Sequence, residues 1–139
     1  MLADERNRWW RWGLTLLSLG NLGNALWMLA DPAGWYRDLP AAVPDTGPFN
    51  QHFVRDIGSA FFVMSVALLW AAWRPRLRAP MVAIVTLFYG LHALVHFADT
   101  IADRLPVSHW LIDAPGVYAP AVLLLVLTMV AFRQEGGRT

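Results

Sequence analysis

The sequence contains no cysteine, which excludes disulfide bonds, thiolate metal ligands and thiol redox chemistry. It also has few charged residues. Asp, Glu, Lys and Arg make up 15% of its 139 residues, whereas hydrophobic residues make up 57%. A soluble domain of this length needs more charge to cover its surface. The net charge of +1 gives no reason to expect a nucleic-acid partner. Composition therefore predicts a membrane protein.

Four hydrophobic segments are long enough to cross a bilayer, since about 20 helical residues span its hydrocarbon core. Polar or proline-rich stretches separate them, and proline prevents one continuous helix. We predict membrane helices at residues 9–30, 53–73, 81–98 and 115–132. The predicted fold class is all-α, with residues 1–139 forming one integral membrane four-helix up-down bundle.

The basic, Trp-rich start of the chain, MLADERNRWWRW, also fits a cleavable signal peptide. Asn21 and Asn24 interrupt the apolar run that follows, and no clear small-x-small cleavage site ends it. We therefore expect an uncleaved first helix.

Basic residues gather on one side of the predicted bundle. They precede the first helix, join the second to the third and follow the fourth: Arg6, Arg8, Arg11, Arg74, Arg76, Arg78, Arg133 and Arg138. The positive-inside rule then places both termini in the cytoplasm. Residues 31–50 and 99–114 would face outward. The first of these loops contains four prolines and several aromatic residues, so we expect an ordered cap on the membrane surface.

Polar side chains converge near the outer ends of three predicted helices. His92, His96 and Asp99 have spacings of four and three residues, which place them on one helical face. His52 and Asp56 are also four residues apart. Ionisable residues are costly in apolar segments and usually face a bundle interior. This convergence predicts the functional site.

A metal centre is the leading interpretation of this cluster. Two histidines one turn apart can both reach one cation, and a neighbouring helix can complete the ligand set. The predicted metal ligands are His52, Asp56, His92, His96 and Asp99. Nitrogen and oxygen donors suit zinc, copper or iron. The residues predicted to bind substrate or to support these ligands are Arg55, Asn21, Asn24 and Tyr89.

Other interpretations stay open. The cluster could be a hydrogen-bonded plug that fixes how the helices pack. It could instead relay protons or hold an anionic group at Arg55. Haem or a pigment could also be bound through a histidine, because Gly90 leaves room for a ring.

Several nearby residues have simpler expected roles. His109, beside Trp110, is expected at the membrane interface and not as a ligand. Asp113 precedes Ala114-Pro115 and is expected to help start the fourth helix. Asn50 is expected to cap the second helix, and Gly58 to let another backbone or a ligand come close.

The stretch WYRDLPAAVPDTGPFNQHFVRDIGSAFF and the later LHALVHFAD resemble a group of small, uncharacterised bacterial four-helix membrane proteins of the DoxX-like class. The resemblance covers most of residues 27–99, and TGPFNQHFVRDIG is its most specific part. It implies a four-helix bundle in a bacterial inner membrane, with oxidoreductase or respiratory partners for some members. It assigns no catalytic residue to this chain.

Two classes of function follow. In the first, the outward-facing His/Asp site binds a metal ion for redox chemistry or metal handling, which leaves open whether the protein is a membrane oxidoreductase. In the second, the protein is a non-catalytic accessory subunit of a respiratory or photosynthetic complex, and the cluster is structural or binds haem or a pigment. The expected partners are the lipid bilayer and either further copies of the chain or a larger membrane complex.

Overall fold

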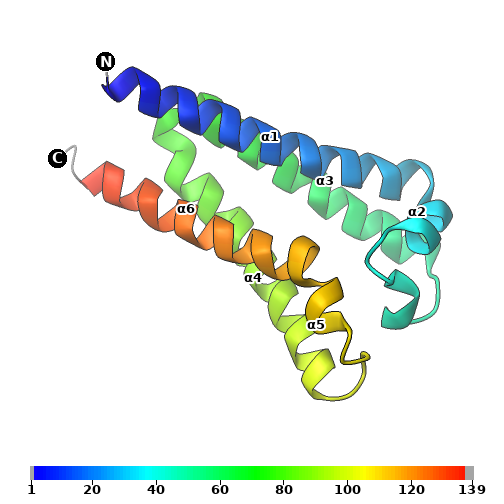
Figure 1. Cartoon of the computed structure of the whole chain (residues 1–139). Helices are drawn as coiled ribbons and strands as arrows, with labels where there is room; N and C mark the ends of the chain where they lie inside the picture. The colour runs from blue at the N-terminus through cyan, green and yellow to red at the C-terminus, as the bar shows by residue number, and fades with distance from the viewer. Residues whose placement is uncertain (1, 137–139) are drawn as a thin grey trace.

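The computed structural model describes residues 2–136, which form helices, turns and loops without a strand. The long helices α1, α3, α4 and α6 carry the fold (Figure 1). They and the shorter elements are α1 (Leu2–Ala30), α2 (Pro32–Asp38), η1 (Val43–Thr46), α3 (Gln51–Trp73), η2 (Pro75–Leu77), α4 (Arg78–Ile101), α5 (His109–Ile112), η3 (Ala114–Tyr118) and α6 (Ala119–Gly136). Arg138 of the predicted basic pattern, and both ends of the predicted domain, lie outside the described residues.

The long helices form two pairs. α1 packs along α3, and α4 packs along α6. The start of α1, the end of α6 and the turn between α3 and α4 lie at one end of the molecule (Figure 1). From that turn α3 and α4 diverge, so the far ends of the two pairs stand apart (Figure 1). The helix positions agree with the four predicted segments, whereas their axes are less parallel than a regular up-down bundle requires.

Three helical segments within residues 2–136 are long and apolar enough to cross a membrane: Gln51–Trp73, Pro75–Ile101 and Ala114–Gly136. The predicted first span is part of α1 but is not among them. Asn21 and Asn24 lower the mean hydropathy of its apolar part. Membrane insertion and the number of crossings therefore stay predictions.

The pair of α1 and α3 is held by close contact. A Cβ atom added at Gly58 would lie 2.8 Å from Met28 Cβ and 3.4 Å from the Ala25 carbonyl oxygen, which confirms that Gly58 admits a neighbouring helix. Farther along, Ser18 Oγ donates to the Ser65 carbonyl at 2.8 Å. Small residues at this interface thus bring the two backbones together.

Replacing Gly58 by Leu is expected to lower the stability of the protein by about 1–3 kcal/mol, because the new side chain overpacks the contact with α1. Thermal unfolding in detergent, followed by circular dichroism, measures the change. The control is Gly90→Leu, since a Cβ atom at Gly90 meets nothing within 4 Å. Equal unfolding temperatures for the two variants would contradict this account of the α1–α3 contact.

The buried core lies toward the end that holds the α3–α4 turn. Trp10, Leu68 and Val82 have no exposed surface, and Trp10 Nε1 donates to Gln134 Oε1 at 3.0 Å. Many large hydrophobic side chains elsewhere point outward, among them Leu16, Leu87 and Leu111. An exterior this apolar suits contact with lipid.

The proline-rich segment after α1 is folded, as predicted. Asp31 Oδ1 accepts from the Gly34 amide at 2.9 Å and caps α2. Tyr36 Oη donates to the Gly47 carbonyl at 2.7 Å, which closes the loop on itself. The predicted cap at Asn50 is confirmed, since its Oδ1 accepts from the Phe53 amide at 3.1 Å. These bonds hold η1 in place beyond the ends of the long helices.

Candidate metal centre

His96, His109 and Asp113 come together although they belong to three successive elements. His96 lies in the last two turns of α4, His109 begins α5, and Asp113 directly precedes η3. Each offers one ligand atom, and these atoms lie within 4.8 Å of one another. The chain reverses direction between α4 and α6, and this reversal brings the three side chains together.

Asp113 lies at the centre of this group, which we call the His–Asp–His site. Its Oδ2 is 2.8 Å from His96 Nδ1. Its two oxygens are 3.3 and 3.2 Å from His109 Nδ1. His109 and Asp113 have exposed fractions of 0% and 1%, and the His96 side chain is 16% exposed. One buried carboxylate is therefore shared by two imidazoles.

A second carboxylate lies behind His109. Asp45 in η1 places Oδ2 at 3.2 Å from His109 Nε2, and its side chain is 45% exposed. The proline-rich loop thus contacts the site through Asp45, and both ring nitrogens of His109 face carboxylate oxygens.

The two carboxylate contacts of His109 restrict where its ring hydrogens can lie. A neutral imidazole has one N–H, and an ionised carboxylate can only accept hydrogen bonds. Both His109 contacts can be hydrogen bonds only if the ring is protonated on both nitrogens or if one carboxyl carries a proton. A cation at Nδ1 removes the conflict, because Nε2–H then donates to Asp45 while the Nδ1 lone pair and Asp113 bind the ion.

Aromatic contacts explain why α5 is fixed against α4. The rings of Phe97 and Trp110 lie 5.5 Å apart, and Trp110 stacks on Tyr118 at 6.1 Å. On the other side, His92 contacts His96 with ring centroids 4.7 Å apart. Thr100 Oγ1 donates to the His96 carbonyl at 2.9 Å. Packing and hydrogen bonds thus hold His96 and His109 in orientation.

Of the residues predicted from the sequence as ligands, the structure brings His92 and His96 together and leaves the others elsewhere. His52 and Asp56 pair with each other at 3.4 Å, with side chains 89% and 63% exposed. Asp99 instead accepts from Arg104 at 2.9 Å. His52, Asp56 and Asp99 do not belong to the His–Asp–His site.

The residues predicted to support the ligands are also dispersed. Arg55 Nε donates to the Leu29 carbonyl at 3.3 Å. Asn24 Oδ1 accepts from Trp35 Nε1 at 2.8 Å and ties α2 to α1. Tyr89 Oη donates to Asn21 Oδ1 at 2.9 Å across the two helix pairs. These side chains connect helices and loops, and Asn21 and Tyr89 line a separate cavity.

Two expectations need correction. His109 is fully buried and not exposed as an interfacial side chain would be, because α5 packs it against α4 and η1. Asp113 makes no side-chain capping bond to the following helix, since its oxygens face the two histidines. The four-residue spacing of His109 and Asp113, the same as in His52/Asp56 and His92/His96, was the available signal. Local sequence cues, the neighbouring Trp110 and the following Ala114-Pro115, favour separate roles for the two residues.

The comparisons with known proteins give a family and no function. No curated protein and no solved structure matches the chain. A family model described as "Domain of unknown function (DUF4345)" matches residues 9–112. That range includes Asp45, His96 and His109 and ends one residue before Asp113. The match leaves the DoxX-like resemblance and the bacterial origin as predictions. Because it covers more than half of the chain, the protein belongs to this uncharacterised family, DUF4345.

Proposed function

We propose that the protein is a membrane-embedded metal-binding protein whose ion is held by His96, His109 and Asp113. The observation that carries this proposal is the buried carboxylate of Asp113 between two imidazole nitrogens, with Asp45 behind one of them. Within residues 2–136 this is the His/Asp group whose ligand atoms converge. The ligand set therefore differs from that proposed from the sequence, and His96 is the member that the two sets share.

The distances support a first-row metal ion. Zinc binds imidazole and carboxylate at about 2.0–2.2 Å, so ligand atoms at the corners of a tetrahedron lie about 3.3–3.6 Å apart. His109 Nδ1 lies 3.2 and 3.3 Å from the Asp113 oxygens. The 2.8 Å contact of His96 is a hydrogen-bond distance and has to lengthen when an ion enters.

The chemistry of the site follows from its donors. Two imidazoles and one carboxylate suit zinc and iron, and imidazole also binds copper. Three protein ligands leave a position open for water or another molecule, as in catalytic zinc sites. The His109–Asp45 contact matches the common arrangement in which a carboxylate orients a metal-binding histidine. The site is thus suited to handling an exchangeable ion, and iron or copper would add redox chemistry.

The position of the site supports a membrane setting with the ion on the outer side. Three segments are long and apolar enough to span a bilayer, and the basic residues Arg74 and Arg76 lie at the α3–α4 turn, away from the site. By the positive-inside rule that turn is cytoplasmic. We propose four passes through a bacterial inner membrane, with both termini cytoplasmic and the His–Asp–His site on the opposite face.

A second candidate function rests on the same contacts. The network joins η1, α4 and α5, and buried polar groups can serve to fix packing. In this case the protein is an accessory subunit of a membrane complex and holds no ion. Stoichiometric partners after purification, together with no bound metal, would favour it.

The proposal is tested by the metal content and absorption spectrum of the full chain purified in detergent without added metal or chelator. We expect close to one equivalent of a first-row transition metal, removable by a strong chelator and restored by Zn²⁺. Bands in the visible range would identify iron or copper. Protein that neither retains metal nor takes up Zn²⁺ would rule out the proposed function.

Replacing Asp45 by Asn should weaken Zn²⁺ binding about 10- to 100-fold, the usual effect of losing a carboxylate that orients a ligating histidine. Competition with a chromogenic chelator measures the dissociation constant. Asp38→Asn is the matched control, because Asp38 lies in the same exposed region and pairs with Arg37. Unchanged affinity in Asp45→Asn would show that Asp45 does not orient His109 for an ion.

A further inference from the structure

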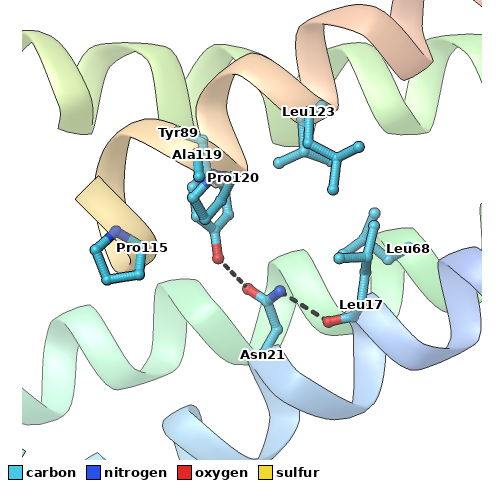
Figure 2. Close-up of a pocket in the computed structure, with 9 residues that line it drawn as sticks. Leu17, Asn21, Leu68, Tyr89, Pro115, Ala119, Pro120 and Leu123 are labelled. Atoms are coloured by element: carbon cyan, nitrogen blue, oxygen red, sulfur yellow. Dashed lines mark hydrogen bonds between the residues drawn. The ribbon is translucent and has the colours of Figure 1, made fainter. Parts of the chain in front are cut away.

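A cavity of about 310 Å³ lies between the two helix pairs and is separate from the His–Asp–His site. α1 and α3 form one wall, and α4, η3 and α6 form the other (Figure 2). The divergence of the pairs leaves this space open. Leu123 and Ala119 line it and are both exposed. The cavity is therefore open to the outside of the molecule at α6.

The lining of the cavity is apolar except for one pair of polar side chains. Leucines, prolines and an alanine make up most of it, and none of its lining residues in the described chain is charged. The exceptions are Asn21 and Tyr89, which approach each other from opposite walls (Figure 2). A neutral ligand is favoured, because a buried charge would have no partner here.

The hydrogen bonds fix what Asn21 can offer a ligand. Its Oδ1 accepts from Tyr89 Oη at 2.9 Å, and its Nδ2 donates to the Leu17 carbonyl at 2.9 Å. The Leu17 carbonyl can only accept, which sets the orientation of the amide. An amide nitrogen carries two hydrogens, so the second can be donated to a ligand oxygen.

We propose that this cavity binds a neutral, bilayer-soluble molecule with a compact apolar body and one oxygen that accepts a hydrogen bond from Asn21. A ketone or an ester meets this description. The volume is about twice the 150 Å³ of a cavity that admits benzene, so it suits a bicyclic or similarly bulky body. The expectation that the molecule arrives from the bilayer rests on the membrane setting proposed above. The metal ion has no part in it.

The test uses equilibrium dialysis of the full chain in detergent, with empty micelles as the blank. The probes are 1-tetralone and tetralin, which share a fused bicycle and differ by one carbonyl group. We expect one tetralone per chain, bound about two- to tenfold more tightly than tetralin, the effect of one added hydrogen bond. No binding of either probe, or equal binding of both, would overturn the proposal.

Substitutions in the cavity lining test whether the probes bind in this cavity. Asn21→Leu should lower tetralone affinity to that of tetralin. Ala119→Phe fills the space and should abolish binding of both probes, whereas Val122→Phe should keep it, because Val122 lies on the same helix and is 63% exposed. Wild-type binding in Ala119→Phe would overturn the location even if Asn21→Leu does not fold.

The natural ligand is sought in organic extracts of the same proteins by mass spectrometry. A stoichiometric molecule present with Val122→Phe and missing from Ala119→Phe supports the proposal, and its headgroup distinguishes a membrane lipid ester from a free ketone. These results do not depend on bound metal. Failure here leaves the metal proposal standing, and loss of the metal site leaves tetralone binding unchanged.

Discussion

Replacing Asp113 by Asn should remove bound metal from the purified protein and weaken Zn²⁺ binding at least about 100-fold. Asp113 is the carboxylate that contacts both His96 and His109, and an amide is a far poorer ligand for a cation. The variant should also lose about 1–3 kcal/mol of stability, because a buried hydrogen-bonding partner of two imidazoles is altered. Metal analysis and thermal unfolding of the same preparation measure both effects.

Asp56→Asn is the matched control for this experiment. Asp56 also pairs with a histidine four residues away, but the pair is exposed. The Asp56→Asn variant should keep wild-type metal content and stability. If Asp113→Asn retains as much metal as Asp56→Asn, the ion is not held by Asp113. Loss of stability without any effect on metal would favour the hydrogen-bonded plug.

Zn²⁺ affinity is expected to fall as the pH is lowered. Imidazole binds a metal only as the neutral ring, so protons compete with the ion at each ligating histidine. Where both rings are protonated in the free protein, the affinity drops by up to about 100-fold per pH unit. Competition titrations with a chelator of known pH dependence give this slope.

Replacing His96 by Ala should make that pH dependence shallower, because one competing imidazole is gone. The control is His52→Ala, since the side chain of His52 is 89% exposed and lies outside the site. A pH dependence equally steep in His96→Ala and in the wild-type protein would contradict His96 as a ligand.

The helix positions were predictable from the sequence because hydrophobic runs and prolines are local signals. Residues 53–73 correspond closely to α3, and the folded loop followed from its prolines and aromatic residues. The divergence of α3 and α4 was not predictable, because periodicity fixes which face of a helix is apolar but not the angle at which helices cross. Parallel helix axes would bring His52 and Asp56 beside His92 and His96, whereas the diverging axes keep them apart.

The site was harder to predict than the fold for a related reason. His109 and Asp113 lie in the connection between α4 and α6, which hydropathy identifies only as polar. The Trp110 contacts that fix this connection against α4 depend on three-dimensional packing. Asp45 is distant in sequence and reaches His109 through the folded loop. The histidines of α4 could be found by their spacing, whereas the partner of His96 depended on how the chain reverses after α4.

The most direct test of the metal site is X-ray absorption at the zinc edge of wild-type protein loaded with one equivalent of Zn²⁺. The account predicts nitrogen and oxygen neighbours at about 2.0–2.2 Å, with the outer-shell scattering of two imidazole rings. In Asp113→Asn that spectrum should be lost or replaced by that of hydrated zinc. A wild-type spectrum that shows only water oxygens, without imidazole scattering, would contradict the account.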